Sequence, residues 1–111
     1  VYISDHAENL FDDEEQRAMH GTATPNRYEV HVPFFVWTSD EYLQVRKEKV
    51  LEMQKHKDCR VSTTNLFDSF ADIAGISYKQ EDKRLSVAAP AFQEDSVWRI
   101  ITPDKHIIKM Q

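Results

Sequence analysis

Apolar positions in this 111-residue chain occur in short runs separated by long polar stretches. Residues 1–4 open with a β-branched and aromatic run, which predicts a buried parallel strand that leads into a loop. Residues 5–30 are mostly polar and predict a loop with at most one helical turn. Residues 31–37 give the clearest strand pattern, with Pro33 near the start of the strand, where a missing N–H is tolerated.

Two helices are predicted in the middle of the chain. The segment Thr38-Ser39-Asp40-Glu41 offers several capping choices, among them Thr38 with Glu41 as a capping box, and a helix of about four turns should follow to Lys55. The second helix should run from Ser62 to Gly75, the expected C-terminal glycine. Its apolar residues have the spacing of a well-buried helical face. They are Leu66, Phe67, Phe70, Ala71, Ile73 and Ala74.

The C-terminal pattern predicts a β-hairpin. Residues 97–101 and 106–109 are the candidate strands, and the four residues 102–105 between them are typical of a turn. With the earlier elements, the order becomes strand, loop, strand, helix, helix and hairpin. This order, with polar side chains at the tips of the strands, predicts an α/β fold of sandwich type.

Composition limits the chain to one modest hydrophobic core and one domain, since 41% of the residues are hydrophobic and 30% are charged. The net charge of −5 and the lack of a basic cluster beyond residues 46–49, which Glu48 interrupts, argue against a nucleic-acid partner. The acidic run at residues 12–15 is typical of solvated surface. Cys59 cannot form an internal disulfide, so it is either a buried free thiol or paired with a residue upstream of Val1.

No apolar stretch is long enough to span a bilayer, and no leader pattern is present. The chain begins with Val1 inside an expected core strand. We therefore expect it to be a piece of a longer protein, and a signal or membrane anchor in that protein stays open.

The most informative chemistry lies just after the first apolar run. Asp5 and His6 are adjacent at the expected strand tip, and Glu8 and His20 follow. A carboxylate and an imidazole side by side suit Zn²⁺, which binds Asp oxygen and His nitrogen. Taken alone, such a pair is usually just a solvated loop carboxylate beside an imidazole.

Four short motifs follow one another along the chain: Ser4-Asp5-His6, His20-Gly21 with Pro25, His31-Val32-Pro33, and Asn65-Leu66-Phe67. In this order they resemble the phosphoethanolamine transferases of the alkaline phosphatase and sulfatase superfamily. The resemblance runs from Val1 to about Ile76 and departs from the family pattern in two places. Ala7 stands where the family has Gly, and Thr63-Thr64 stand where it has His-Asp.

The resemblance implies that residues 1–111 are the C-terminal part of a catalytic domain with a mostly parallel sheet flanked by helices. It implies that Asp5 and His6 bind zinc and that His20 contacts the transferred phosphoryl group as a hydrogen-bond donor, a proton donor or a ligand of a second metal. His31 would either face the substrate or be a structural residue at the strand edge. Glu8 would orient His6 through its other ring nitrogen.

The family's nucleophilic Thr and its remaining metal carboxylate would lie before Val1, so the isolated chain is expected to be inactive. Thr22 and Thr24 have no neighbouring group in the sequence that would activate them as nucleophiles. His56 and His106 are expected to be solvated.

The resemblance also implies the partners. The donor would be phosphatidylethanolamine and the acceptor a lipid or glycan such as lipid A, at the periplasmic face of a bacterial inner membrane. Contact with that membrane would be made by a segment outside this chain. Two alternatives stay open: another enzyme of the superfamily, a sulfatase-like hydrolase or polyglycerol-phosphate synthase, and a non-catalytic pseudoenzyme.

Overall fold

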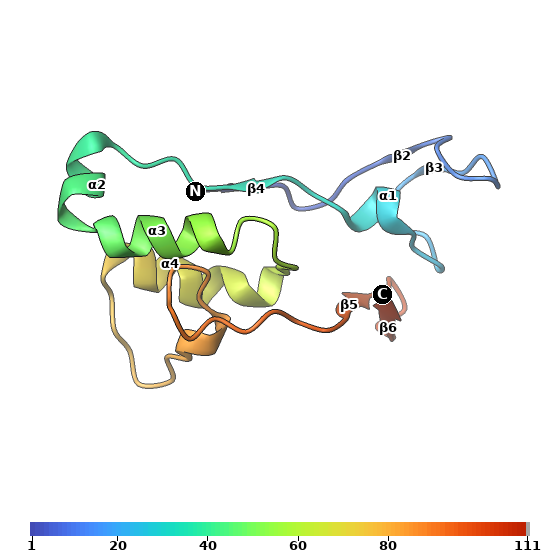
Figure 1. The fold of residues 1–111 in the computed structure, drawn as a ribbon. Helices are drawn as coiled ribbons and strands as arrows, with labels where there is room; N and C mark the ends of the chain where they lie inside the picture. The colour runs from blue at the N-terminus through green and yellow to red at the C-terminus, as the bar shows by residue number, and fades with distance from the viewer. Residues whose placement is uncertain (111) are drawn as a thin grey trace. The chain divides into compact units, whose positions relative to one another are not determined.

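A computed structural model describes residues 1–110, and these fall into two compact units (Figure 1). The first unit contains residues 1–36 and the C-terminal segment that begins at Val97. The second unit comprises Trp37–Ser96. In the described part of the chain, no helix is both long and apolar enough to cross a membrane.

The first unit is built from three antiparallel strand pairs. Strand β1 (Tyr2–Ile3) pairs with β4 (Phe34–Phe35), β2 (Asn9–Leu10) with β3 (Ala18–Met19), and β5 (Trp98–Ile101) with β6 (Ile107–Met110). The predicted C-terminal hairpin is therefore confirmed. The predicted mostly parallel sheet is not confirmed, because every pair among the described residues is antiparallel.

The two strands predicted at residues 1–4 and 31–37 are present but short. They meet each other directly, with Tyr2 opposite Phe35 and the two rings stacked at a centroid distance of 4.9 Å. Beyond Phe34, Pro33 has no N–H to extend the ladder, and only its carbonyl is used, by the Ser4 N–H at 3.4 Å.

Between β3 and β4 lies the short helix α1 (Arg27–Val30), the one helical turn expected in this region. Asn26 caps it through a bond from the Tyr28 N–H to its side chain at 2.9 Å. Glu29 completes a capping box by accepting from the backbone N–H of Asn26.

The second unit is helical. It contains α2 (Asp40–Val45), α3 (Lys47–Lys55), α4 (Leu66–Ala74) and two short 3₁₀ helices, η1 (Thr63–Asn65) and η2 (Lys83–Leu85). Its buried apolar residues are Val50, Ala71, Val87, Ala88 and Ala89. This core is small, as the composition indicated.

The prediction of one helix of about four turns up to Lys55 was wrong, because the helix breaks at Arg46. The N-cap is Ser39, one of the capping choices that the sequence offered, and its hydroxyl accepts from the Tyr42 N–H. Arg46 has φ −128° and ψ 38°, outside the helical region; its N–H closes α2 on the Tyr42 carbonyl, and its own carbonyl accepts the Lys49 N–H to start α3.

Helix α4 ends where the sequence predicted, at Gly75 with φ 71°. Of the residues predicted to form its buried face, Ala71 is buried, but Phe67 and Phe70 are exposed, and the other buried residues of the helix are polar. The reason is that each buried polar side chain has partners: Asp68 accepts from Tyr78 and Asp82, Ser69 from Val87, and Asp72 from Lys49, Lys83 and Ser86.

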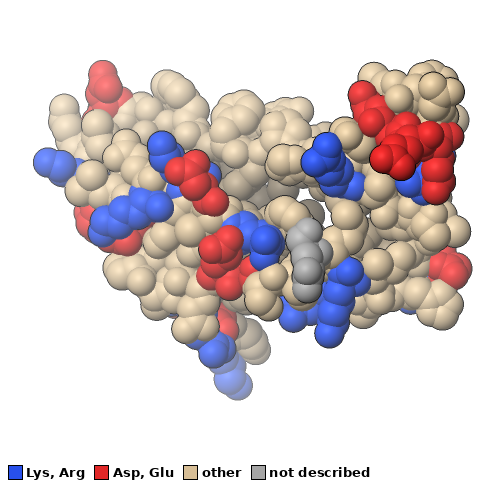
Figure 2. Space-filling model, turned by 45° about the vertical axis from the view of Figure 1, so that its right-hand side comes forward, with Lys and Arg blue, Asp and Glu red and all other residues tan. Residues whose placement is uncertain are grey.

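Charge is unevenly distributed over the surface. On the face drawn in Figure 2, acidic side chains gather at the end of the first unit that carries the β2–β3 hairpin, whereas basic side chains are scattered. The connection between β2 and β3 contains the acidic run Asp12, Asp13, Glu14 and Glu15. Cys59, in the second unit, is a half-buried free thiol.

Candidate functional site

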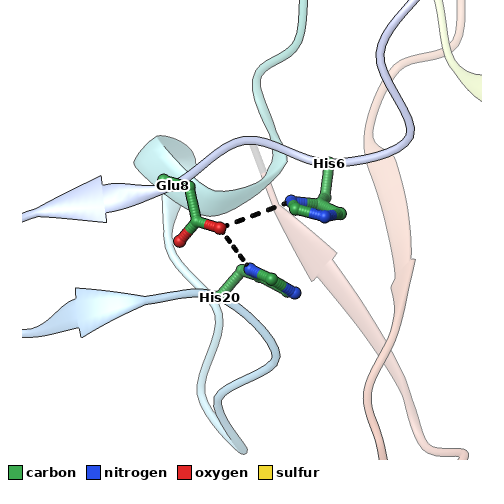
Figure 3. Close-up of side chains that lie close together, drawn as sticks. All are labelled: His6, Glu8 and His20. Atoms are coloured by element: carbon green, nitrogen blue, oxygen red, sulfur yellow. Dashed lines mark hydrogen bonds and ion pairs between the residues drawn. The ribbon is translucent and has the colours of Figure 1, made fainter.

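His6, Glu8 and His20 come together in the first unit (Figure 3). The Glu8 Oε1 atom lies 2.6 Å from Nδ1 of His20 and 3.8 Å from Nδ1 of His6. The two imidazole rings stack with a centroid distance of 3.7 Å. One donor atom from each residue lies within 4.8 Å of the other two, so the three side chains form a single cluster.

The β2–β3 hairpin explains why residues 12 positions apart meet. Asn9 lies opposite Met19 in the ladder, so Glu8 and His20, the next residue beyond each, emerge at the same end of the hairpin. His6 lies just before, in a turn where the Ser4 hydroxyl donates to the His6 carbonyl at 2.8 Å. The local backbone therefore brings both histidines to the same carboxylate.

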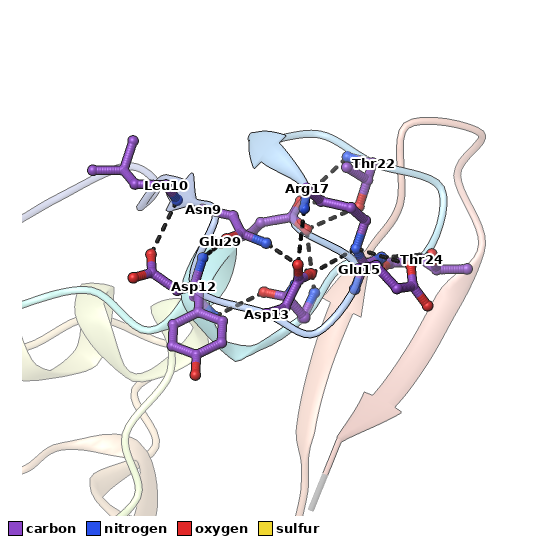
Figure 4. Close-up of polar contacts among 11 residues, drawn as sticks. Asn9, Leu10, Asp12, Asp13, Glu15, Arg17, Thr22, Thr24 and Glu29 are labelled. Carbon is purple, nitrogen blue, oxygen red and sulfur yellow. Dashed lines mark hydrogen bonds and ion pairs between the residues drawn. The ribbon is translucent and has the colours of Figure 1, made fainter.

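A partly buried polar network supports this hairpin (Figure 4). Asp13 accepts from the side chains of Asn9 at 2.9 Å, Asn26 at 2.8 Å and Arg17 at 2.7 Å. Burial alone would raise the pKa of Asp13, but the hydrogen bonds from Arg17 and Asn9 outweigh it and hold the pKa below its usual range. Asp13 thus ties together the hairpin and the turn that begins α1.

Asp5 lies on the other side of His6. Its Oδ2 atom is 3.8 Å from Nε2 of His6, and its side chain is 89% exposed. Zinc–nitrogen and zinc–oxygen bonds are about 2.0–2.2 Å, so two donors of one ion lie at most roughly 4.3 Å apart. The separation of the Asp5 and His6 donor atoms is below this limit, whereas the three donor atoms that lie closest together in the described part of the chain belong to His6, Glu8 and His20.

The two nitrogens of His6 face different groups. Nε2 faces Asp5, and Nδ1 lies 3.2 Å from the Ala7 carbonyl, closer than the 3.8 Å to Glu8. The sequence argument paired Glu8 with His6, but the short contact of Glu8 is with His20. The carbonyl that best orients His6 is that of Ala7.

The contact with Glu8 defines the proton arrangement of His20. A carboxylate oxygen only accepts, so Nδ1 of His20 carries the proton that points at Glu8. When the imidazole is neutral, Nε2 has a free lone pair; when it is protonated, Nε2 holds a proton that can be donated. His20 can therefore donate a proton from Nε2 when the ring is protonated. When the ring is neutral, the Nε2 lone pair can accept a hydrogen bond or bind a metal ion.

The remaining histidines lie outside this cluster. His31 is exposed and lies beside the Trp98 ring, at a centroid distance of 6.5 Å, and its backbone N–H caps α1. His106 is exposed, as expected. The expectation that His56 is merely solvated was wrong, because its Nδ1 lies 2.9 Å from the Val87 carbonyl and its ring contacts Phe92.

Ala7 has no strained backbone, although the corresponding family position is Gly. The non-glycine residues with positive φ among those described are Phe11, Gln16, Met19 and Lys105. Ala7 is not one of them, so its Cβ carries no left-handed penalty.

Two features of the site were not found from the sequence. One is the Glu8–His20 contact, which needed the pairing of β2 with β3. The other is Glu29, which is 3% exposed and bonded to Thr22. Its spacing from Asn26 is that of a capping box, a signal that could have indicated an ordered turn here.

The sulfatase family matches residues 1–76. Phosphoethanolamine transferase EptC of Escherichia coli K12 is 29% identical over 99 residues, which cover 88% of this chain and 17% of that protein. Phosphoethanolamine transferase CptA of Salmonella typhimurium LT2 is 27% identical over the same shares of each chain. The chain thus spans 17% of the length of these relatives. No solved structure matches it significantly.

Proposed function

Since the chain belongs to the sulfatase family, we propose that it is the C-terminal part of the catalytic domain of a metal-dependent phosphoethanolamine transferase. The relatives named phosphoethanolamine transferase, matched over most of this chain, support that choice within the family. Residues 1–111 would complete an alkaline-phosphatase-like fold whose mostly parallel sheet is formed with other parts of the protein.

The observation that carries this proposal is the cluster of His6, Glu8 and His20. Two histidine motifs that the sequence separates share one carboxylate, with His6 also next to Asp5. Phosphoryl transfer needs positive charge and a proton donor near the phosphoryl oxygens, and this cluster can supply both.

Enzymes of this superfamily are generally metal-dependent, and the donor set here suits zinc. Asp5 and His6 would hold the ion. When bound, zinc offsets negative charge on the phosphoryl group and lowers the pKa of a hydroxyl nucleophile, which other parts of the protein would supply.

The chain's own residues would act around that ion. His20, with Nδ1–H held by Glu8, would donate the proton on Nε2 to the leaving oxygen as the phosphorus–oxygen bond breaks. Glu8 would stabilise the protonated ring, and the Ala7 carbonyl would orient His6. His31 would contribute to the substrate side of the site from beyond the cluster.

The proposed donor is phosphatidylethanolamine and the proposed acceptor a lipid or glycan such as lipid A. The reaction would take place at the periplasmic face of a bacterial inner membrane. A segment other than residues 1–111 would attach the enzyme to the bilayer.

The direct test is the product formed by the full-length protein in vesicles of phosphatidylethanolamine and lipid A, followed by mass spectrometry. We expect lipid A that carries phosphoethanolamine, together with diacylglycerol. Release of free phosphoethanolamine without modified lipid A would indicate a hydrolase. Absence of both products from a zinc-loaded, folded protein would indicate a pseudoenzyme.

A further inference from the structure

Glu29 connects the two segments that carry the histidine cluster. Its carboxylate accepts the Thr22 hydroxyl, at 2.9 Å from Oε1 and 3.0 Å from Oε2, and the Thr22 N–H at 3.3 Å. Its backbone carbonyl accepts the Ala7 N–H at 2.9 Å. Thr22 is two residues after His20, and Ala7 lies between His6 and Glu8. One buried residue is therefore bonded to both segments. Figure 4 shows its side chain together with Thr22.

We infer that Glu29 is a positioning residue, which sets the place of the His20 imidazole relative to His6 and Glu8. Among the described residues, its hydrogen bonds go to Thr22, Asn26 and Ala7, so it acts on the cluster through Thr22 and Ala7. The inference rests on the proposed function, since it concerns the residue that would transfer the proton.

The Glu8–His20 contact is too exposed to fix the geometry by itself. The side chains of Glu8 and His20 are 42% and 41% exposed, and ion pairs in that setting contribute little because water competes for both partners. Glu29 as a whole residue is only 3% exposed, so its bonds to Thr22 are shielded from such competition. The rigid connection in this region is therefore the buried one.

Glu29 is itself held in place from both sides. It lies in α1, whose N-cap Asn26 bonds to Asp13 at 2.8 Å, and the Asn26 N–H also approaches the Glu29 carboxylate at 3.4 Å. A displacement of Glu29 would shift the His20 loop and the His6 turn together. Small displacements of this kind reduce the rate of a positioned proton transfer more than they reduce substrate binding.

A glutamine at this position tests the carboxylate specifically. The amide has nearly the same shape but only one acceptor oxygen, so its NH₂ group must face either the Thr22 N–H or the Asn26 N–H. Thr22→Val is a milder second variant, because it removes one hydroxyl and keeps Glu29 intact.

The matched control is Asp68→Asn in the second unit. Asp68 is also a buried carboxylate that accepts one hydroxyl, from Tyr78, and one backbone N–H, from Asp82. Both carboxylate-to-amide changes should lower Tm, and a purely structural role predicts no difference between them in catalysis.

The experiment measures kcat, KM and Tm of phosphoethanolamine transfer by the full-length protein carrying Glu29→Gln, Thr22→Val, Asp68→Asn or His20→Ala. We expect Glu29→Gln to lower kcat by roughly 10- to 100-fold with KM within about twofold of wild type. Thr22→Val should lower kcat less, and adding it to Glu29→Gln should cause little further loss. Asp68→Asn should keep the wild-type kcat.

If Glu29→Gln keeps the wild-type kcat while His20→Ala loses it, the positioning role of Glu29 is contradicted and the proposed role of His20 stands. Wild-type kcat in His20→Ala would overturn the proposed role of the cluster and the inference with it. If Glu29→Gln does not fold, Thr22→Val decides by the same criterion: a lower kcat at unchanged KM supports the role, and a wild-type kcat contradicts it.

Discussion

At the scale of single residues, the chain contains two Asp–His pairs with similar local geometry and different surroundings. Asp5 and His6 approach within 3.8 Å beside the Glu8–His20 contact, whereas Asp104 and His106 approach within 3.4 Å in the tight turn between β5 and β6. The neighbouring donors, and not the pair itself, distinguish a candidate metal site from solvated surface.

This contrast predicts the metal content of the full-length protein. Under the proposed function, His6→Ala should lose most of its bound zinc, because it removes the imidazole ligand and leaves Asp5 with only the donors expected from outside this chain, whereas His106→Ala should retain the zinc. Zinc content per protein, measured by elemental analysis after dialysis, is the readout. Equal zinc content in wild type and His6→Ala would show that the metal is held elsewhere.

The order of the motifs in the sequence was enough to identify Asp5, His6 and His20 as candidate site residues. It was not enough to predict which side chains contact one another. Adjacent residues such as Asp5 and His6 are necessarily neighbours. The short contact of Glu8 with His20 depends on the pairing of β2 with β3, and the Thr22–Glu29 bond joins the loop after His20 to α1; neither segment has a periodic sequence signal.

At the scale of elements, local signals predicted helix ends better than helix faces. Gly75 ends α4 with φ 71°, a backbone conformation that glycine adopts freely. The face of α4 could not be predicted from its apolar spacing. Its buried side is held by hydrogen bonds and ion pairs to Lys49, Lys83 and Ser86, and all three are distant in sequence.

Replacement of Gly75 tests the C-cap. Gly75→Ala should reduce the free energy of unfolding by about 1–2 kcal/mol, because a Cβ is strained at this φ. The added Cβ would also lie 3.2 Å from the Arg46 guanidinium. Gly75→Asn should cost less, since Asn tolerates the left-handed region, although it carries the same Cβ. Chemical denaturation measures both variants. Equal losses of stability would show that the contact of the new Cβ with the Arg46 side chain, and not strain from the positive φ, is the cause.

At the scale of the whole molecule, the two compact units are stabilised by different polar centres. Asp13 organises the hairpin of the first unit, and Asp72 is the centre of the second. Asp72 accepts from Lys49 and Lys83, both at 2.6 Å. Burial would raise the pKa of Asp72, but bonds from Lys49, Lys83 and Ser86 lower it to about 2.

That lowered pKa predicts acid sensitivity of the second unit. The folded pKa of about 2 lies below the ordinary 3.8, so the stabilisation by ionised Asp72 is present above about pH 4 and lost as the pH falls through about 2. Asp72→Asn should lower the free energy of unfolding at pH 7 by about 2–4 kcal/mol. It should also make the fall in that free energy between pH 4 and pH 2 less steep. Chemical denaturation across this pH range measures both effects, with Asp58→Asn, at an exposed position, as the control. An unchanged decline in Asp72→Asn would contradict the assignment.

The central claim of the proposed function is that His20 acts on the transferred phosphoryl group. The measurement is kcat for phosphoethanolamine transfer by full-length His20→Ala, beside His106→Ala, whose imidazole also lies near a carboxylate. We predict a loss of roughly 10²–10⁴-fold for His20→Ala with little change in Tm, and no loss for His106→Ala. Equal, small effects on kcat at both positions would contradict the account and leave His20 a surface histidine.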